Sequence, residues 1–262
     1  MKNLVTIADG RIEYSFYEVK RPAAPTIVML HEGLGALSLW RDLPRKLSNL
    51  INCSVFVYSR HGYGQSDFIN SEFDAKYMHK EALHILPQVL NHFDIRNPIL
   101  YGHSDGASIA LIHASSADNE IMGLILEAPH VFVEEISLDG LRGAKKAFEE
   151  GGLKASLAKH HRNPEMIFRC WNNIWLSPEF LTWNIVSCLS KIQCPALLIQ
   201  GETDAYGTLS QLDTIEKNVS GSSEKKILPH VGHSPHRENP ELVLRSIQQF
   251  ISKISMHNNV ND

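Results

Sequence analysis

Five residues, Gly102-His103-Ser104-Asp105-Gly106, constrain the fold of this chain more than any other stretch. A short apolar run at 98–101 precedes them, and a run of small and apolar residues at 107–114 follows them. The first run is typical of a buried strand and the second of a helix. Between a strand and a helix, the pattern G-x-S-x-G forms a turn so tight that it needs glycine close to the serine. The sequence therefore predicts that Ser104 projects from the end of a sheet as a candidate nucleophile.

Composition and charge narrow the class of protein. With 262 residues, 43% apolar and 21% charged, the chain is long enough for one large α/β domain with a substantial core. A net charge of −4 gives no electrostatic basis for a nucleic-acid partner. The sequence shows neither the apolar run of a signal peptide nor the roughly 20 apolar residues of a membrane span. We therefore expect a cytoplasmic monomer or homodimer with no membrane partner, and reduced thiols at Cys53, Cys170, Cys188 and Cys194.

Short apolar runs alternate with helical segments along most of the chain. A hairpin is predicted first, pairing 4–8 with 11–19 across Asp9 and Gly10. Buried strands are then expected at 26–31, 54–59, 98–102, 121–127, 196–200 and 225–228. Helices are expected at 39–50, 74–93, 105–116, 209–219 and 240–254, the second with a kink or break at Pro87. The pattern predicts a mostly parallel sheet of about eight strands with helices on both faces.

The alternation fails between residues 130 and 193, where no strand is predicted and large aromatic residues are frequent. We interpret 130–193 as a helical cap inserted into a core domain of 1–129 and 194–262. A cap there would lie over the carboxyl ends of the strands, where ligands bind in open α/β folds. Most of its aromatic side chains should form its own core, and a few should line a pocket. The predicted pocket residues are Leu34, Phe132, Trp171 and Trp175.

A serine nucleophile needs a base, and the base needs an acid that orients it. In this architecture the acid follows a late strand and the histidine follows the last strand. Asp204 and His233 occupy those positions, and Gly232 leaves the loop free to bring the imidazole to Ser104. We predict that Ser104, Asp204 and His233 form a catalytic triad. The alternatives at these positions are Glu202 and Asp213 for the acid, and His230 and His236 for the base.

The oxyanion formed when a serine attacks a carbonyl needs N–H donors already in place. One predicted donor is the backbone N–H of Asp105, at the start of the helix that follows Ser104. The second should come from the loop His31-Glu32-Gly33-Leu34-Gly35, with Gly33 preferred over Glu32 or Leu34. The carboxylate of Asp105 lies beside a site for negative charge, and we expect it to satisfy the helix N-terminus.

Together these motifs resemble the α/β-hydrolase superfamily over nearly the whole chain. They are His31-Glu32-Gly33-Leu34-Gly35, Ser59-Arg60-His61-Gly62-Tyr63-Gly64-Gln65-Ser66, the G-x-S-x-G turn, Gly201-Glu202-Thr203-Asp204 and Gly232-His233. The second resembles a D-x-x-G-x-G-x-S turn of the superfamily, with Ser59 in place of aspartate. The chain is similar to capped bacterial serine carboxylesterases, including pimeloyl-carrier-protein methyl ester esterases of biotin biosynthesis. The resemblance implies an α/β-hydrolase fold and ester hydrolysis through an acyl-enzyme on Ser104, without metal or organic cofactor.

Two other functions remain open at this stage. One is carbon–carbon bond hydrolysis of the aromatic-degradation type. Those enzymes usually carry an aromatic residue after the histidine and an arginine in the pocket, whereas Ser234 follows His233 and only Arg162 or Arg169 could serve here. The other is a small-molecule receptor that keeps the triad without turnover.

A basic segment of the cap suggests a macromolecular substrate. Residues 142–162 hold six lysines and arginines against two glutamates, a local charge of +4. A solvated helical face accounts for this, but so would a docking surface for an acidic acyl-carrier protein that delivers a tethered ester. The substrate is thus predicted to be a small-molecule ester, or one bound to an acyl-carrier protein.

Overall fold

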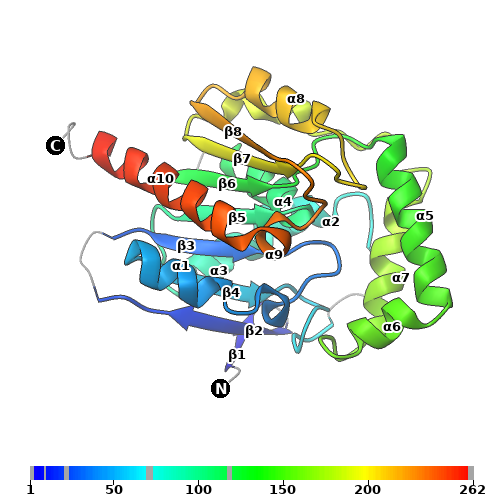
Figure 1. Ribbon diagram of the computed structural model, residues 1–262. Coiled ribbons are helices and arrows are strands. Elements are labelled where there is room, and N and C mark those ends of the chain that lie inside the picture. The colour runs from blue at the N-terminus through cyan, green and yellow to red at the C-terminus, as the bar shows by residue number, and fades with distance from the viewer. Residues whose placement is uncertain (1–2, 9, 21–23, 69–72, 117–119, 259–262) are drawn as a thin grey trace.

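The computed structural model describes residues 3–8, 10–20, 24–68, 73–116 and 120–258. Its centre is an eight-stranded sheet with the order β1-β2-β4-β3-β5-β6-β7-β8 (Figure 1). The strands are β1 (Asn3–Ile7), β2 (Gly10–Tyr17), β3 (Thr26–Leu30), β4 (Ser54–Ser59), β5 (Ile99–His103), β6 (Gly123–Glu127), β7 (Ala196–Gly201) and β8 (Ser223–Leu228). Strand β2 pairs antiparallel with β1 and with β4, and all the other pairs are parallel. The predicted mostly parallel sheet of about eight strands is confirmed.

Helices cover both faces because the central strands are apolar on both sides. All residues of β4, β5, β6 and β7 are buried. On one face, α1 (Leu43–Ile51) and α10 (Pro240–Asn258) contribute Leu47, Val243 and Ile247 to a hydrophobic cluster with the sheet. On the other face lie α2 (Tyr77–Lys80), α3 (Leu86–His92), α4 (Asp105–Ala114) and α8 (Ser210–Asn218), which pack into a second, larger cluster.

The break expected at Pro87 takes the form of a π-helical segment. The predicted helix 74–93 is divided into α2, a π-helix at Glu81–Ile85, and α3, with Pro87 in the first turn of α3. Proline has no N–H to donate, and it is tolerated in a first helical turn where that donor is not needed. The π-helix therefore ends directly before α3, the helix that Pro87 helps to start.

The segment that we interpreted as a cap lies between β6 and β7 and is called the cap below. It consists of α5 (Glu135–Glu149), α6 (Gly152–Leu157) and α7 (Pro164–Trp175), followed by a 3₁₀ helix at Val186–Lys191. These three α-helices stand together beside the sheet layer in Figure 1. Their buried aromatic residues, among them Phe148, Phe168 and Trp175, belong to the same hydrophobic cluster as α4 and α8. The cap is thus joined to the sheet by a continuous apolar contact. Within the described residues, no helix combines the length and apolar character needed to cross a membrane.

Candidate active site

Ser104 lies in a strained turn between β5 and α4, as the pattern around it predicts. Its backbone has φ 52° and ψ −118°, in the region that residues other than glycine rarely adopt. A Cβ on Gly102 would lie 2.3 Å from the carbonyl oxygen of Gly106, and one on Gly106 would lie 2.0 Å from that of Leu30. Both glycines are therefore required by close backbone approach. The turn places the Ser104 side chain at the carboxyl end of β5, where the residue is buried.

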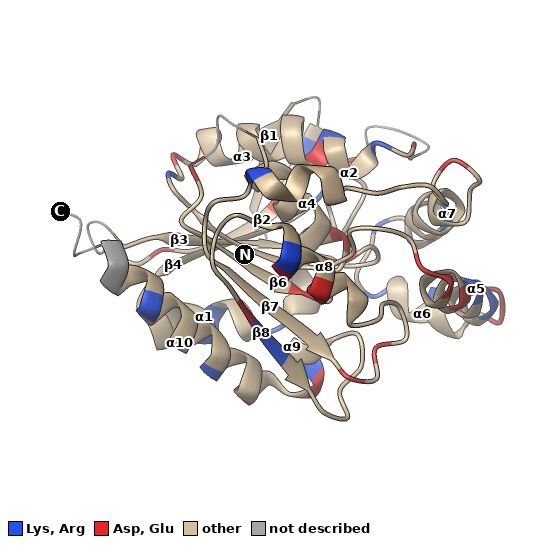
Figure 2. Cartoon of the chain, turned by 90° about the horizontal axis from the view of Figure 1, so that it is seen from above, with Lys and Arg blue, Asp and Glu red and all other residues tan. Residues whose placement is uncertain are grey.

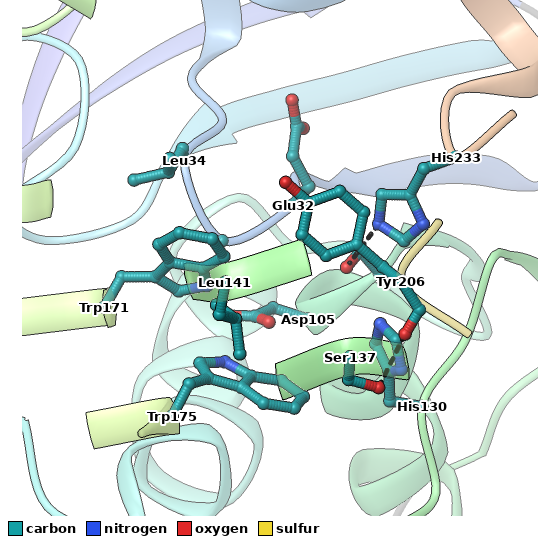
Figure 3. Close-up of a pocket in the computed structure, with 12 residues that line it drawn as sticks. Glu32, Leu34, Asp105, His130, Ser137, Leu141, Trp171, Trp175, Tyr206 and His233 are labelled. Carbon is teal, nitrogen blue, oxygen red and sulfur yellow. Dashed lines mark hydrogen bonds between the residues drawn. The ribbon is translucent and has the colours of Figure 1, made fainter. Parts of the chain in front are cut away.

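Ser104, His233 and Asp204 form a continuous line of hydrogen bonds. The His233 Nε2 lies 3.0 Å from Ser104 Oγ, a hydrogen bond drawn as a dashed line at His233 in Figure 3. The Nδ1 of His233 lies 2.8 Å from Asp204 Oδ1. An ionised Asp204 accepts the Nδ1–H, which leaves the lone pair of Nε2 facing the serine hydroxyl. This arrangement can remove the proton of Ser104 as its oxygen attacks an electrophile.

The surroundings of Asp204 keep its carboxyl group ionised. Burial alone would raise the pKa, but the hydrogen bond and charge of His233 and the backbone N–H of Tyr206 outweigh it. The pKa of Asp204 is therefore lowered. The side-chain amide of Gln200 also donates to Asp204 Oδ2 at 3.2 Å. Asp204 can thus orient the imidazole throughout the neutral pH range.

The alternative acids and bases lie elsewhere. Glu202 is exposed, and Asp213, on α8, accepts from Lys225 at 2.7 Å. His230 is exposed, whereas His236 is buried and bonded through Nδ1 to Glu127. None of the four contacts Ser104.

Next to Ser104 is a cavity of about 120 Å³. Its walls come from the sheet ends and from the cap, and Figure 3 shows most of these side chains. They are Glu32, Gly33, Leu34, Ser104, Asp105, His130, Ser137, Leu141, Trp171, Trp175, Tyr206 and His233. Of the predicted pocket residues, Leu34, Trp171 and Trp175 are therefore present. Phe132 is not, because its backbone pairs with Asn184 in an isolated bridge and its side chain packs against the hydrophobic core.

Several lining residues were not predicted from the sequence. His130 follows the end of β6 by three residues, and Tyr206 follows Asp204 by two. Both residues lie in loops at the carboxyl ends of strands, where ligands bind in open α/β folds, so their positions could have marked them as lining residues. Ser137 and Leu141 are four residues apart on α5 and so share one helix face. Which face of α5 meets the cavity depends on helix packing, for which the sequence holds no local signal.

Both predicted oxyanion donors belong to the cavity wall. Gly33 and Asp105 line it beside Ser104, from the loop after β3 and from the start of α4. A Cβ on Gly33 would lie 1.9 Å from the indole nitrogen of Trp171. Glycine is therefore required at position 33 for the cap helix α7 to pack against this loop. The role of the two N–H groups remains a prediction.

The Asp105 carboxylate does not cap its helix, contrary to expectation. It accepts a hydrogen bond from the Tyr77 hydroxyl at 2.6 Å and lies 4.0 Å from the Arg60 guanidinium. Burial raises the pKa of Asp105, and Arg60 and Tyr77 act against that rise. Tyr77 in turn accepts from the indole N–H of Trp175 at 2.9 Å. Partners from distant segments, rather than the helix terminus, thus surround this buried group.

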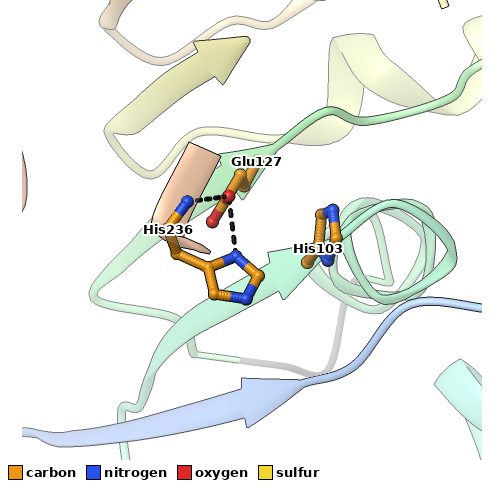
Figure 4. A group of neighbouring side chains, drawn as sticks. All are labelled: His103, Glu127 and His236. Carbon is orange, nitrogen blue, oxygen red and sulfur yellow. Dashed lines mark hydrogen bonds and ion pairs between the residues drawn. The ribbon is translucent and has the colours of Figure 1, made fainter. Parts of the chain in front are cut away.

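One group of described side chains has the composition of a metal site, namely His103, Glu127 and His236, with ligand atoms within 4.8 Å of one another (Figure 4). Hydrogen bonds already occupy both oxygens of Glu127, however. His236 donates to one from its backbone N–H at 2.7 Å and from Nδ1 at 2.8 Å, and the Tyr101 hydroxyl donates to the other. A metal would have to displace these bonds, so we interpret the group as a buried hydrogen-bond network.

This network supports the loop that carries His233. His103, directly before Ser104, lies with Nε2 2.7 Å from the backbone carbonyl oxygen of His233. Burial would lower the pKa of His103, but Glu32 and Glu127 outweigh burial and raise it. A protonated His103 donates from Nε2 to that carbonyl and carries positive charge between two carboxylates.

The basic segment of the cap is less cationic than its local count suggests. Described ion pairs join Arg142 to Glu135 and Asp139, Lys146 to Glu150, Lys154 to Glu165, and Arg162 to Asp67. Figure 2 shows blue and red side by side along α5. Three of these partners, Glu135, Asp139 and Glu165, lie in the cap just outside the 142–162 window. The predicted surplus of +4 is therefore largely offset at this surface.

Comparison with known proteins agrees with the fold. The sequence profile of the Alpha/beta hydrolase family matches residues 27–246, which is most of the chain. The chain belongs to the alpha/beta hydrolase family. Hydrolysis is accordingly the broad class of its activity.

Relatives and similar structures in this family carry different names. The chain is 24% identical over 257 residues to the 2-succinyl-6-hydroxy-2,4-cyclohexadiene-1-carboxylate synthase of Enterobacter sp. (strain 638), covering 88% of this chain and 93% of that one. The Mycobacterium smegmatis proline iminopeptidase structure has a TM-score of 0.78 at 16% identity, with all of both chains covered. A thermophilic esterase from Thermogutta terrifontis has a TM-score of 0.69 at 21% identity, covering 97% of this chain and 99% of that one. At these identities the structures establish the fold alone.

Proposed function

We propose that this alpha/beta hydrolase is a serine esterase that cleaves small carboxylic esters through an acyl-enzyme on Ser104. The observation that carries the proposal is the hydrogen-bonded line from Asp204 through His233 to Ser104, which ends at the mouth of an apolar cavity. A serine hydroxyl with such a base, beside a site for an acyl group, is equipped for acyl transfer.

The proposed reaction has two halves. Ser104 Oγ attacks the ester carbonyl while His233 Nε2 takes its proton, and the backbone N–H groups of Gly33 and Asp105 stabilise the oxyanion. His233 then gives its proton to the leaving alcohol as the carbon–oxygen bond breaks. In the second half, water attacks the acyl-enzyme, His233 takes the water's proton and returns it to Ser104, and the carboxylic acid leaves.

The cavity favours a short acyl group. Its volume of about 120 Å³ is well below the roughly 300–1,000 Å³ of sites for drug-sized ligands. Leu34, Leu141, Trp171 and Trp175 supply apolar walls. These walls support an ester with a small apolar acyl chain, including a methyl ester of such an acid. A long acyl chain delivered by a carrier protein would need the cap to move.

The proposal is tested by removing the nucleophile. Ser104→Ala should reduce hydrolysis of p-nitrophenyl acetate and butyrate to the uncatalysed background, without loss of folded structure by circular dichroism. Ser115→Ala is the matched control, because Ser115 lies outside the cavity and its hydroxyl donates to the carbonyl of Ile112 at the end of the helix that Ser104 precedes. Wild-type turnover by Ser104→Ala would refute the acyl-enzyme mechanism.

The two alternative functions have less support. Neither arginine considered for carbon–carbon bond cleavage lines the cavity, since Arg162 pairs with Asp67 and Arg169 pairs with Glu165. A receptor without turnover would be labelled at Ser104 by a fluorophosphonate and yet hydrolyse no ester in a broad panel. Labelling together with turnover above about 1 s⁻¹ would favour the enzyme.

A further inference from the structure

The loop that carries Asp204 is fastened to the cap as well as to the sheet. It connects β7 to α8, and Thr208 within it donates from its backbone N–H and its hydroxyl to Glu134, at 2.9 and 2.6 Å. The Ser137 hydroxyl donates to the backbone carbonyl of Tyr206 at 2.6 Å. Glu134 and Ser137 lie just before and within the first turn of α5. The acid of the proposed triad is thus held on a loop that rests on α5.

Tyr206 contacts both the acid and the base. Its backbone N–H donates to Asp204 Oδ1 at 2.8 Å. Its ring lies beside the His233 imidazole, with centroids 4.7 Å apart and planes tilted by 43° (Figure 3). The ring also packs against α5, so closely that a Cβ on Gly140 would lie 2.8 Å from it. Tyr206 therefore contacts both a cap helix and the imidazole.

The ring of Tyr206, rather than its hydroxyl, makes the packing contacts. Within the described residues the phenol oxygen takes part in no hydrogen bond, although the residue lines the cavity. Burial and the nearby Asp204 raise the pKa of Tyr206, so the phenol remains neutral and adds no charge beside His233. Tyr206 therefore contacts the His233 imidazole through the apolar face of its ring, and this contact restricts rotation of the imidazole.

We propose that Tyr206 is a positioning residue through which helix α5 of the cap holds Asp204 and His233 in line with Ser104. The proposal rests on the proposed esterase function. The 3.0 Å contact between His233 Nε2 and Ser104 Oγ must be kept as charge develops on the imidazole. A displacement of about 1 Å in such a geometry costs on the order of 10²-fold in rate. The cap therefore contributes to the chemical step and not only to the shape of the cavity.

The first test compares two substitutions of Tyr206. Tyr206→Ala removes the ring and should lower kcat by about 10- to 100-fold on p-nitrophenyl acetate, with KM changed less than threefold. Tyr206→Phe keeps the ring and should retain kcat within threefold of wild type. Equal losses in the two variants would overturn the proposal, because the hydroxyl would then act on the substrate. A change confined to KM would also overturn it.

The second test asks whether α5 acts through the ring. Gly140→Ala places a methyl group against Tyr206 and should lower kcat, whereas Gly143→Ala, with no atom within 4 Å of the added Cβ, is the matched control and should not. In the Tyr206→Ala background the contact with the ring is gone and only the Ala205 carbonyl oxygen, 3.0 Å from the added Cβ, remains close, so Gly140→Ala should have a clearly smaller effect there. A Gly140→Ala effect of the same size in both backgrounds would refute the coupling.

A third readout separates this proposal from the proposed function. The rate at which a fluorophosphonate labels Ser104 depends on the alignment of His233 but not on ester turnover. If wild type labels rapidly yet hydrolyses no ester, the esterase proposal fails, and the positioning role is still decided by the labelling rates. Tyr206→Ala should then label about tenfold or more slowly than Tyr206→Phe. Equal labelling rates would overturn the positioning role.

Discussion

The two walls of the cavity differ in the kind of side chain that they contribute. The sheet side brings polar groups tied together by hydrogen bonds, as in the line from Asp204 to Ser104. The cap side brings apolar surface from Leu141, Trp171 and Trp175. The difference suggests that reactivity comes from the ends of the strands and substrate shape from the cap. Tyr206, fixed at the junction, would connect the two.

Buried titratable groups are also concentrated at the ends of the strands, on the sheet side. Glu127 is buried, yet His236 and His103 lower its pKa to about 2. His130 is kept neutral, since burial first and the neighbouring His233 second lower its pKa to about 3. Such groups are stable inside a protein only when partners or neutrality offset their desolvation. The sheet side is therefore the more sensitive to pH and to loss of a partner.

The largest expected effect comes from removing His233, the proposed general base. His233→Ala should lower kcat/KM by about 10⁴-fold or more on p-nitrophenyl esters, because no other described group is placed to take the Ser104 proton. His230→Ala, an exposed histidine of the same loop, should stay within threefold of wild type. Steady-state kinetics of both variants checks this. Similar losses in the two would mean that the loop, and not the base, had been disturbed.

The next effect concerns the cap wall. Leu141→Ala should enlarge the cavity and raise kcat/KM for hexanoate relative to acetate esters by about tenfold, at a stability cost of about 2–5 kcal/mol. Leu138→Ala, on the same helix and buried outside the cavity, should cost similar stability without changing the chain-length preference. A series of p-nitrophenyl esters measures the preference. An unchanged profile in Leu141→Ala would remove the cap from substrate selection.

A smaller effect is expected in the dependence of stability on pH. The pKa of His130 is about 3 in the folded protein and near 6.5 unfolded, so the unfolded chain binds the proton more readily between these values. Stability should therefore fall as the pH is lowered from 6.5 towards 3, by up to about 1.4 kcal/mol per pH unit for this group. Buried His31 and His113, whose pKa values are also lowered, act in the same direction.

Urea unfolding at pH 7 and at pH 5 measures this contribution. His130→Phe should flatten the pH dependence relative to wild type, whatever its effect on stability at pH 7. The exposed His230 supplies the control, and His230→Phe should leave the pH dependence as it is in wild type. An unaltered slope in His130→Phe would contradict the lowered pKa.

The smallest effect is expected on the outer face of the cap. Lys145→Glu combined with Lys146→Glu should leave the hydrolysis of p-nitrophenyl acetate unchanged, because both side chains are exposed and screened by solvent. A rise in KM confined to an ester carried by an acyl-carrier protein, and reduced by added salt, would show a docking role for this surface. Such a result would give the cap a further function, besides shaping the cavity and holding the Asp204 loop.

The sequence predicted the sheet side far better than the cap side, for a physical reason. The turn at Ser104 and the loop of Asp204 follow β5 and β7, whose short apolar pattern is local and easily recognised, and the His233 loop follows the more polar β8. Phe132 was predicted to line the cavity and does not, whereas Leu141 lines it without having been predicted. Tertiary packing, and not local composition, decides which side chains of this segment meet the cavity. The partners of a buried group such as Asp105 likewise come from distant segments.

The central claim is an acyl-enzyme on Ser104, and rapid-quench kinetics with mass spectrometry tests it most directly. With p-nitrophenyl butyrate in excess, we expect a burst of nitrophenolate close to one equivalent of enzyme if deacylation limits turnover. Acid-quenched samples should carry a butyryl adduct, of about 70 Da by elementary composition, on the peptide that contains Ser104 and on no other. Turnover with the adduct on another residue, or sustained turnover with Ser104 never acylated, would contradict the account.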